Sequence, residues 1–344
     1  MNEKRDQHSE QLFLTFSPDD MTLSERNHIM LGGIAPRPIA LVGTISGEGY
    51  INLAPFSFYN ALSANPPIVA FSPAFRGSDG SPKHTLLNIL ETGEFTINAV
   101  TSSMAEQVSL TSADYPAGVD EFVKAGLTRR TSEVIKPPGV AESPFIMECK
   151  LYDHQDFGGG PGSGNLILGE VVRFHVSQSI YIDGRLDPFK LDLIGRMGGE
   201  WYCRARGSAL VKIARPRHTG IGIDALPYWI RTSSILAGND LAGLAGVERL
   251  PDAEDIRRRW REYFAIDSPE SPGDFDAELE RGDGYKAREI LVSRMKAPSP
   301  ELLVLSNDLH RLCRVFLRAG DIKAAWECAW LGDAEKLEEL LENM

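Results

Sequence analysis

The chain has 344 residues, of which 42% are hydrophobic and 24% are charged, and its formal net charge is −12 at pH 7. These values are those of an ordinary folded protein, and the length predicts two domains at roughly 150 residues each. The acidic balance argues against general nucleic-acid binding, which needs a basic face, but it leaves room for a local basic pocket that holds a phosphate.

The cysteines and the N-terminus set expectations about the cellular compartment. Cys149, Cys203, Cys313 and Cys328 form no CxxC pair, and their spacing predicts neither a disulfide framework nor a metal site. Free thiols suit a reducing compartment, so a cytoplasmic protein is expected. The polar opening MNEKRDQHSEQ lacks the apolar stretch of a secretory signal, and no run approaches ~18 apolar residues, so no membrane span is expected.

The first part of the chain predicts a tail, a short helix and then strands. Residues 1–24 form the predicted tail, in which charged residues are frequent, and Ser24 is the expected N-cap of a helix that stops at Gly32-Gly33. Apolar and turn-forming residues then alternate through 36–72. They predict strands at 39–45, 50–53 and 68–72, with a glycine turn at 46–49.

Residues 54–63 are unusual for a core strand. They combine three aromatic side chains with Ser57, Asn60 and Ser63, all of which can form hydrogen bonds. A plain core strand would place apolar residues at alternate positions. Flat rings, small hydroxyls and backbone amides suit a flat heteroaromatic ligand with polar edges. An irregular, proline-interrupted edge strand is the alternative, and the pattern alone leaves both open.

A Gly/Ser/Pro-rich loop at 73–82 leads to Lys83-His84-Thr85, at the start of a helix predicted over 85–91 and stopped by Gly93. A cation and a hydroxyl at a helix N-terminus form a plausible phosphate site, because the free N–H groups and the helix dipole attract an anion. Arg76 could share the phosphate charge as a bidentate donor. The alternative is that Thr85 is an ordinary N-cap and Lys83 a solvated charge.

The next segments complete a β-rich domain. Further elements are expected as a strand at 95–100, a helix at 103–112, a connection at 113–127 with Phe122 and Leu127 buried, and strands at 140–151 and 166–177. Cys149 alternates with polar neighbours and is expected to be buried. Gly158 to Gly164 lacks the lysine and hydroxyl of a P-loop, which favours a hairpin loop or a lid. Gly198, Gly199, Trp201 and Tyr202 close the domain, and the two rings offer flat surface or end packing.

The C-terminal part predicts helices. A linker is expected at 214–218, an amphipathic helix at 251–266, a break at 268–273 and a helix from Ser299, as cap, to about Arg318. Gly320-Asp321 and Gly332-Asp333 each open a short helix, but two copies are too few to indicate a repeat array. The side chains of Trp326, Cys328 and Trp330 are expected in a core.

No Ser-His-Asp arrangement, metal cluster or paired-carboxylate site is evident from the sequence, which fits a protein whose cofactor carries the chemistry. An ordered set of motifs supports this interpretation. Residues 25–214 resemble the flavin reductase-like, FMN-binding split β-barrel family. The matching motifs are Pro36-Arg37-Pro38, Thr44-Ile45-Ser46, the run NLAPFSFYN at 52–60, Pro66-Pro67, Lys83-His84-Thr85-Leu86, Asn88-Ile89, Gly93-Glu94-Phe95, Asn98, LGEVV at 168–172, RMGG at 196–199 and Tyr202.

The resemblance implies an antiparallel Greek-key barrel with flanking helices that binds FMN rather than FAD. It implies flavin contacts from Thr44, Ser46, Ser57, Tyr59, Asn60, Ala61 and Ser63, and phosphate contacts from Lys83, Thr85 and Arg76. The family has Asp where this chain has His84, which puts the role of that residue in doubt. His175 is a second-tier candidate near the flavin, with an ordinary strand histidine as the alternative.

The function implied is hydride transfer from NADH or NADPH to FMN, in a homodimer with flavin near the subunit interface. Reduced flavin would then leave for a partner monooxygenase or pass its electrons on. One alternative is a tight flavoprotein that reduces a small aromatic or nitro compound, or carries electrons. Another is a non-catalytic flavin-binding module that acts through residues 219–344, a mostly helical extension which the resemblance does not cover.

Overall fold

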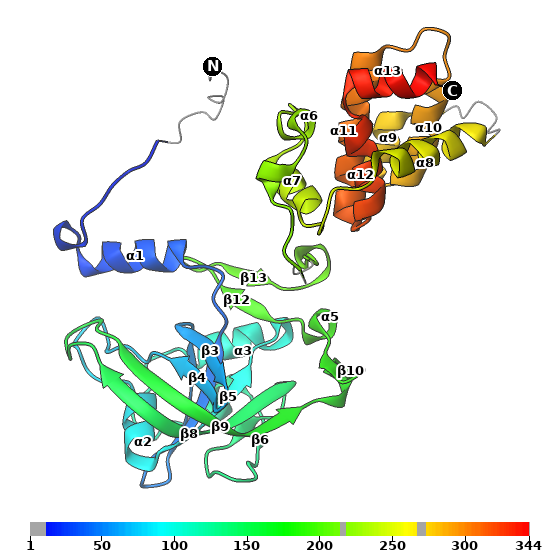
Figure 1. Cartoon of the computed structure of the whole chain (residues 1–344). Coiled ribbons are helices and arrows are strands. Elements are labelled where there is room, and N and C mark those ends of the chain that lie inside the picture. Colours follow the sequence, from blue (N-terminus) through cyan, green and yellow to red (C-terminus); the bar gives the residue numbers. More distant parts are fainter. Residues whose placement is uncertain (1–11, 214–217, 267–272, 344) are drawn as a thin grey trace. The chain divides into compact units, whose positions relative to one another are not determined.

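The computed structural model describes residues 12–213, 218–266 and 273–343. The chain divides into two compact units, Met1–Lys212 and Ile213–Met344, called here the barrel unit and the helical unit (Figure 1). Each unit has its own hydrophobic core. The start of the predicted tail, nearly all of the predicted linker at 214–218 and most of the break at 268–273 lie outside the described residues.

Seven antiparallel strands form the main sheet of the barrel unit, in the order β2-β1-β5-β8-β9-β4-β3. They are β1 Ala40–Ile45, β2 Ile51–Phe56, β3 Tyr59–Ala64, β4 Pro67–Phe71, β5 Glu94–Ala99, β8 Phe145–Asp156 and β9 Asn165–Val176. Short pairs are β6 Arg129–Arg130 with β7 Gly139–Val140, β10 Tyr181–Ile182 with β11 Arg185–Leu186, and β12 Ile194–Arg196 with β13 Tyr202–Arg204. The expected fold class, an antiparallel β domain followed by a helical one, is confirmed.

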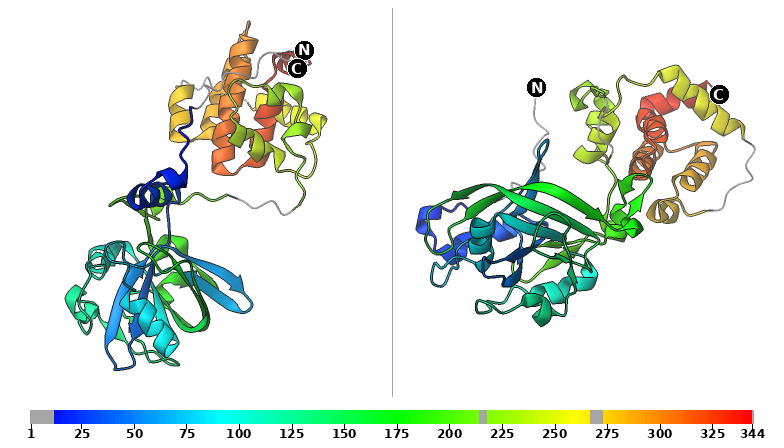
Figure 2. Two further views of the ribbon diagram at one scale, coloured as in Figure 1. Left: turned by 90° about the vertical axis from the view of Figure 1, so that its left-hand side faces the viewer. Right: turned by 90° about the horizontal axis from the view of Figure 1, so that it is seen from below.

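The sheet closes on itself at Ser57 and Phe58. β2 and β3 lie at opposite ends of the strand order, yet only these two residues connect them. The step from Phe56 to Tyr59 spans at most ~11 Å, whereas the edges of a flat sheet of this size lie far apart, since neighbouring strands are ~4.8 Å apart. The sheet must therefore curl until its edges meet, and Figure 2 shows this curl from two further directions.

β1 shows how the core of the barrel unit is divided. Ala40 and Val42 pack in one cluster, which also receives Leu86 from α2 (His84–Thr92). Ile39 and Leu41, on the alternate face, pack in a second cluster with side chains of α3 (Ala105–Leu110) and α4 (Glu121–Ala125). The continuous apolar run at 39–42 is thus explained by burial on both faces of the sheet. Helix α2, which contains Thr85 and follows Lys83, is held by the first cluster.

Several predicted boundaries in the barrel unit need correction. The first helix is α1 (Leu23–Gly33), and its N-cap is Thr22, not Ser24, because Thr22 and Glu25 form a reciprocal capping box. Gly32 and Gly33 belong to its last turn. The strand predicted at 140–151 is broken by a turn between β7 and β8, and the helix predicted at 103–112 is η2 (Ser102–Met104) followed by α3. The remaining helices are η1 Pro18–Asp20, η3 Gln178–Ile180, α5 Pro188–Leu191 and η4 Gly207–Ala209.

Helices alone build the helical unit in the described residues. They are η5 Ile223–Ala225, α6 Tyr228–Arg231, α7 Gly238–Ala245, α8 Ala253–Ala265, α9 Phe275–Arg281, α10 Gly284–Met295, α11 Leu302–Ala319, α12 Ile322–Leu331 and α13 Ala334–Glu342. The helices expected at 251–266 and up to Arg318 are confirmed as α8 and α11. The N-cap of α11 is Glu301, however, so the predicted cap Ser299 is wrong. Trp326 and Cys328 are buried as expected.

A Gly-Asp pair precedes four helices of this unit, α9, α10, α12 and α13, two more than the sequence pattern indicated. Asp283, Asp321 and Asp333 each accept a hydrogen bond from the backbone N–H three residues later, at 3.0, 3.0 and 3.1 Å. Gly282 and Gly320 take positive φ angles of 78° and 77°, which end the preceding helices. None of the helices in the described ranges is both long and apolar enough to cross a membrane.

Candidate functional site

Two basic side chains meet at the N-terminus of α2. Lys83 is the N-cap residue, and its Nζ lies 2.8 Å from Asp114 Oδ1. Arg76 Nε lies 3.1 Å from the same oxygen. The hydrogen bonds from Lys83 and Arg76 lower the pKa of Asp114. Arg76, Lys83 and the first turn of α2 are called the basic corner below, and its charge and free N–H groups suit an anion.

The loop before α2 is folded around Arg76. Its NH1 donates to Ser81 Oγ at 3.0 Å and to the carbonyl oxygen of Pro82 at 2.6 Å. The backbone N–H of Arg76 donates to the Ser81 carbonyl at 2.9 Å. These contacts fix the guanidinium beside Lys83. Burial, followed by repulsion from Arg76 and Lys83, lowers the pKa of His84 and so favours the neutral imidazole.

A buried polar network lies behind the basic corner. Asn52 Nδ2 donates to Thr85 Oγ1 at 2.9 Å and to Thr44 Oγ1 at 3.3 Å, and Asn88 Nδ2 donates to Thr44 Oγ1 at 3.0 Å. Thr85 is only 1% exposed. Its oxygen accepts from Asn52, and its hydroxyl proton has no acceptor among the residues that the structure describes, so it can donate to a further acceptor. Thr44 is fully buried and accepts two bonds, so the structure places it inside the network and away from the surface.

Ser46 lies in the turn between β1 and β2, where its Oγ accepts from the backbone N–H of Tyr50 at 3.1 Å. In the same turn the backbone N–H of Gly47 donates to Glu91 Oε2 at 2.9 Å. Glu91 belongs to the last turn of α2, whereas Lys83 and Thr85 lie at its start. The structure therefore does not bring Ser46 to the basic corner.

The polar segment 54–63 contains the end of β2, the closing residues and the edge strand β3, so the edge-strand interpretation of its backbone is confirmed. Tyr59 packs partly against the core, and burial, followed by the nearby Cys149 thiol, raises its pKa to about 12. Asn60, Ala61 and Ser63 are exposed. The side-chain oxygens of Asn60 and Ser63 accept from the backbone N–H groups of Ala61 and Asn65, at 2.9 and 3.2 Å.

Arg37 organises the region around Ser57, and it was not among the predicted site residues. It is 5% exposed. Its NH1 donates to the carbonyl oxygens of Leu31 and Ile34, its NH2 to that of Met197 at 2.9 Å, and its Nε to Ser57 Oγ at 3.3 Å. Burial, then the charge of Arg196, lowers the pKa of Arg37. The flanking residues Pro36 and Pro38 indicate a fixed backbone at Arg37. They do not indicate which groups the guanidinium binds.

His175 lies on β9, and its side chain is 11% exposed. Its Nε2 lies 2.6 Å from Oε1 of Glu148, a fully buried carboxylate. Glu148 also accepts from the backbone N–H groups of Glu133, Val134 and Ile135, at 2.7, 2.8 and 3.2 Å. Burial alone would raise the pKa of Glu148, but the N–H groups of Glu133 and Val134 and the imidazole together lower it. His175 thus has the contacts of a structural residue.

The segment that closes the barrel unit, with Gly198, Gly199, Trp201 and Tyr202, is more exposed than a segment packed against the end of the barrel would be. The side chain of Trp201 is 78% exposed, and Tyr202 packs against the guanidinium of Arg196, whose carbon lies 4.6 Å from the ring centre. A Cβ at Gly198 would lie 3.0 Å from the Cα of Gly32, so α1 already approaches this glycine closely. End packing is therefore wrong for Trp201, which offers a flat surface.

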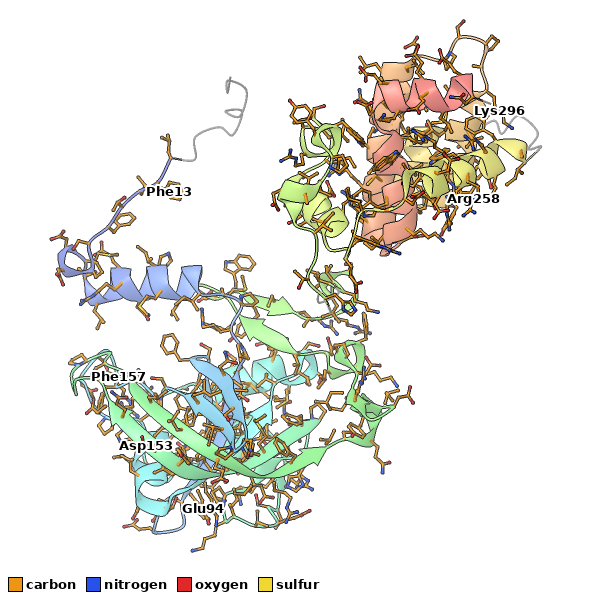
Figure 3. The ribbon with its side chains drawn as sticks, in the orientation of Figure 1. Phe13, Glu94, Asp153, Phe157, Arg258 and Lys296 are labelled. Carbon is orange, nitrogen blue, oxygen red and sulfur yellow. The ribbon has the colours of Figure 1, made fainter. Side chains whose placement is uncertain are left out.

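The β8–β9 hairpin carries the glycine-rich loop at its tip. Gly158, Gly159 and Gly162 take positive φ angles, as expected of a turn. Phe157, at the same tip, is half-exposed and is labelled with Asp153 in Figure 3. Within the described ranges, no group of three or more His, Cys, Asp or Glu side chains lies close enough to bind a metal ion.

Comparison with known proteins agrees with this geometry. The model of the flavin reductase like domain matches residues 32–190. Nitrilotriacetate monooxygenase component B of Bacillus cereus is 35% identical, with a TM-score of 0.54, over 56% of this chain and 96% of that one. The chain belongs to the flavin reductase-like family. Its members with known structures show that the seven-stranded barrel is the family's split barrel.

Two further solved structures are similar to the barrel unit of this chain. The 2-nitrobenzoate 2-nitroreductase NbaA of Pseudomonas fluorescens is 29% identical, with a TM-score of 0.53, over 60% of this chain and 98% of that one. A split-barrel protein of Shewanella frigidimarina, classed with the flavin reductases, is 29% identical, with a TM-score of 0.51, over 59% of this chain and all (100%) of that one. The family and these structures make this chain a flavin-related oxidoreductase.

Proposed function

We propose that the protein is an FMN-dependent oxidoreductase in which FMN accepts hydride from NADH or NADPH, and that it supplies reduced flavin to a partner monooxygenase. The observation that carries this proposal is the basic corner. The side chains of Arg76 and Lys83 converge on one carboxylate oxygen of Asp114 at the N-terminus of α2. A flavin without a phosphate would have no use for such a site, and FMN ends in a phosphate.

The residues of the corner fit the cofactor. Arg76 and Lys83 would hold the phosphate through charge-assisted hydrogen bonds, since their present partner is itself an anionic oxygen. Thr85 would add its free hydroxyl proton. Asn52, which holds Thr85, and Ser57 are five positions apart along the extended chain, a separation of ~17 Å. This distance suits an extended ligand whose phosphate lies at the corner and whose ring lies near Ser57.

The side chains near the ring would bind and orient it. Bound FMN would supply the redox chemistry, so no protein side chain needs to act as an acid or base. Tyr59, whose pKa is raised to about 12, keeps its phenol proton at neutral pH and can donate a hydrogen bond. Ser57 accepts from Arg37, which leaves its own proton to donate. Asn60, Ala61 and Ser63 complete the proposed set through contacts of the edge strand β3, while Thr44 would support Asn52 and Asn88 behind the corner and Ser46 would fix the turn between β1 and β2.

The proposal assigns flavin binding to residues 25–214, with 1–24 as a tail and 219–344 as an extension that binds a partner or sets the oligomeric state.

A homodimer is proposed because apolar side chains are exposed before and around α1 and on β9. They include Leu12, Phe13, Leu14, Phe16, Met30 and Phe174. Phe13 is labelled in Figure 3. Exposed apolar patches of this kind favour a protein interface.

A second candidate is a tight flavoprotein that reduces a nitroaromatic compound directly. The similarity to the nitroreductase NbaA favours it, because that structure is 29% identical over 60% of this chain, with a TM-score of 0.53. The two candidates differ in how firmly the flavin is held. An exchangeable flavin separates from the protein during gel filtration, whereas a prosthetic flavin elutes with it.

Air-free spectroscopy tests the proposed function. The purified protein is mixed with FMN and then with NADH or NADPH, and the visible absorbance is followed. Loss of the yellow flavin absorbance, faster than in a mixture without protein, is the expected result. FMN binding without any acceleration by either nucleotide would contradict the proposed reaction and favour a non-catalytic flavin-binding module.

A further inference from the structure

We propose that Asp114 is a built-in occupant of the basic corner, which the phosphate of FMN must displace, so that this carboxylate weakens FMN binding and keeps the flavin exchangeable. The inference rests on the proposed function, because it concerns the same phosphate site. It adds Asp114, a residue that the family resemblance did not point to, and gives it a role that opposes FMN binding.

The contacts of Asp114 are those of a bound anion. Its Oδ1 accepts from Lys83 Nζ at 2.8 Å and from Arg76 Nε at 3.1 Å. Within the described part of the chain, the side chain of Asp114 has no other hydrogen-bond partner. A single oxygen thus bridges both cations, as one oxygen of a phosphate would.

Asp114 can leave this position at little structural cost. Its side chain is 60% exposed. It lies in the irregular segment between α3, which ends at Leu110, and α4, which begins at Glu121. Its departure therefore breaks no helix or strand, and water can hydrate the released carboxylate. Exposed ion pairs contribute little to stability, so the exchange is readily reversible.

Arg76 and Lys83 differ in how they depend on Asp114. Arg76 is also held by Ser81 and Pro82, and its guanidinium stays in place when the carboxylate moves away. Lys83 Nζ contacts only Asp114 among the described residues. The corner is therefore kept assembled by its loop, and Asp114 is not required to build it. This distinguishes a competitor from a positioning residue, whose loss would weaken binding.

The test compares Asp114→Asn with the wild-type protein. The carboxylate loses its charge while its size is kept. Glu106→Gln, an exposed residue of α3 without a hydrogen-bond or ion-pair partner in the described chain, is the matched control for net charge. Dissociation constants for FMN and for riboflavin, which lacks the phosphate, are measured by quenching of flavin fluorescence, and circular dichroism checks the fold of each variant.

The Asn variant is expected to bind FMN between about two- and thirtyfold more tightly than the wild type, since two exposed ion pairs no longer compete. Riboflavin binding should be unchanged, and Glu106→Gln should affect neither ligand. Unchanged or weaker FMN binding by Asp114→Asn would overturn the inference, as would an equal gain for both flavins. If neither the wild type nor Asp114→Asn binds FMN more tightly than riboflavin, the proposed phosphate site itself is wrong. If the variant prefers FMN but binds it no more tightly than the wild type does, the inference alone fails.

Discussion

Replacing Glu148 by Gln should destabilise the barrel unit strongly, although the two side chains have nearly the same shape. In the structure Oε1 accepts from the Glu133 N–H and contacts His175, while Oε2 accepts from the N–H groups of Val134 and Ile135. Glutamine carries an NH2 group in place of one oxygen. That group cannot accept, so one set of buried donors loses its partner whichever way the amide is turned.

The size of the effect follows from the burial of this carboxylate. Glu148 is fully buried, and an unsatisfied buried donor costs about 1–3 kcal/mol. With one or two donors unpaired, and one charge-assisted bond weakened, the free energy of unfolding should fall by about 3 kcal/mol. The lowered pKa of Glu148 also has a consequence for pH. Its stabilising contribution is present above its ordinary pKa and is lost as the pH falls through the lower pKa of the folded state.

Urea denaturation of the barrel unit within the full chain, followed by near-ultraviolet circular dichroism, measures this loss. Glu170→Gln on β9, a partly exposed carboxylate without a side-chain partner in the described residues, is the matched control and should change stability by under about 0.5 kcal/mol. FMN affinity should be unaffected by Glu148→Gln under conditions where the variant is folded. A loss below about 1 kcal/mol would refute the reasoning, because the donors would then have found other partners.

Two other predictions concern stability. Because the pKa of His84 is lowered by burial, Arg76 and Lys83, the unfolded chain takes up this proton more readily, and His84→Asn should gain stability relative to the wild type as the pH falls below 6.5. Thermal unfolding at pH 7.5 and 5.5 measures this, and an equal shift in both proteins would contradict it. Gly169→Ala should cost about 1–3 kcal/mol, because its Cβ would lie 2.3 Å from Cζ of the buried Phe95. A melting temperature equal to that of the wild type would show that the ring can move aside.

Local sequence patterns were sufficient for most of the barrel. The β-branched run of β1 and the glycine stop of α2 at Gly93 both follow from short-range preferences, and the structure has them. Cys149 is buried as predicted, but the alternation around it is not kept, because Ile146 and Glu148 are buried as well. Phe122 and Leu127 are also buried as predicted. These features depend on neighbours in sequence or on a simple two-face pattern, so no knowledge of the tertiary fold was needed.

The site was harder to predict because its contacts join distant segments. Asp114 meets Lys83 only once the loop after α3 is folded, and Arg37 reaches Met197 across most of the barrel unit. Ser46 matched a family motif, yet its hydroxyl completes a turn at the other end of α2. In the helical unit, the helices between α8 and α11 were missed because their apolar residues form no clear stripe along one helix face. Asp283 nevertheless marks the start of α10, with the same Gly-Asp pair that is seen later in the chain.

The most direct test of a phosphate-binding flavoprotein is the ratio of the dissociation constants for FMN and riboflavin in Lys83→Met. Lys83 contacts only Asp114 among the described residues, so the change should leave the fold intact. Lys124→Met, on the exposed face of α4, controls for the loss of one positive charge. The account predicts about tenfold weaker FMN binding, as expected for one partly exposed charge-assisted hydrogen bond, with riboflavin binding unchanged. Equal weakening for both flavins, or none for either, would contradict the account.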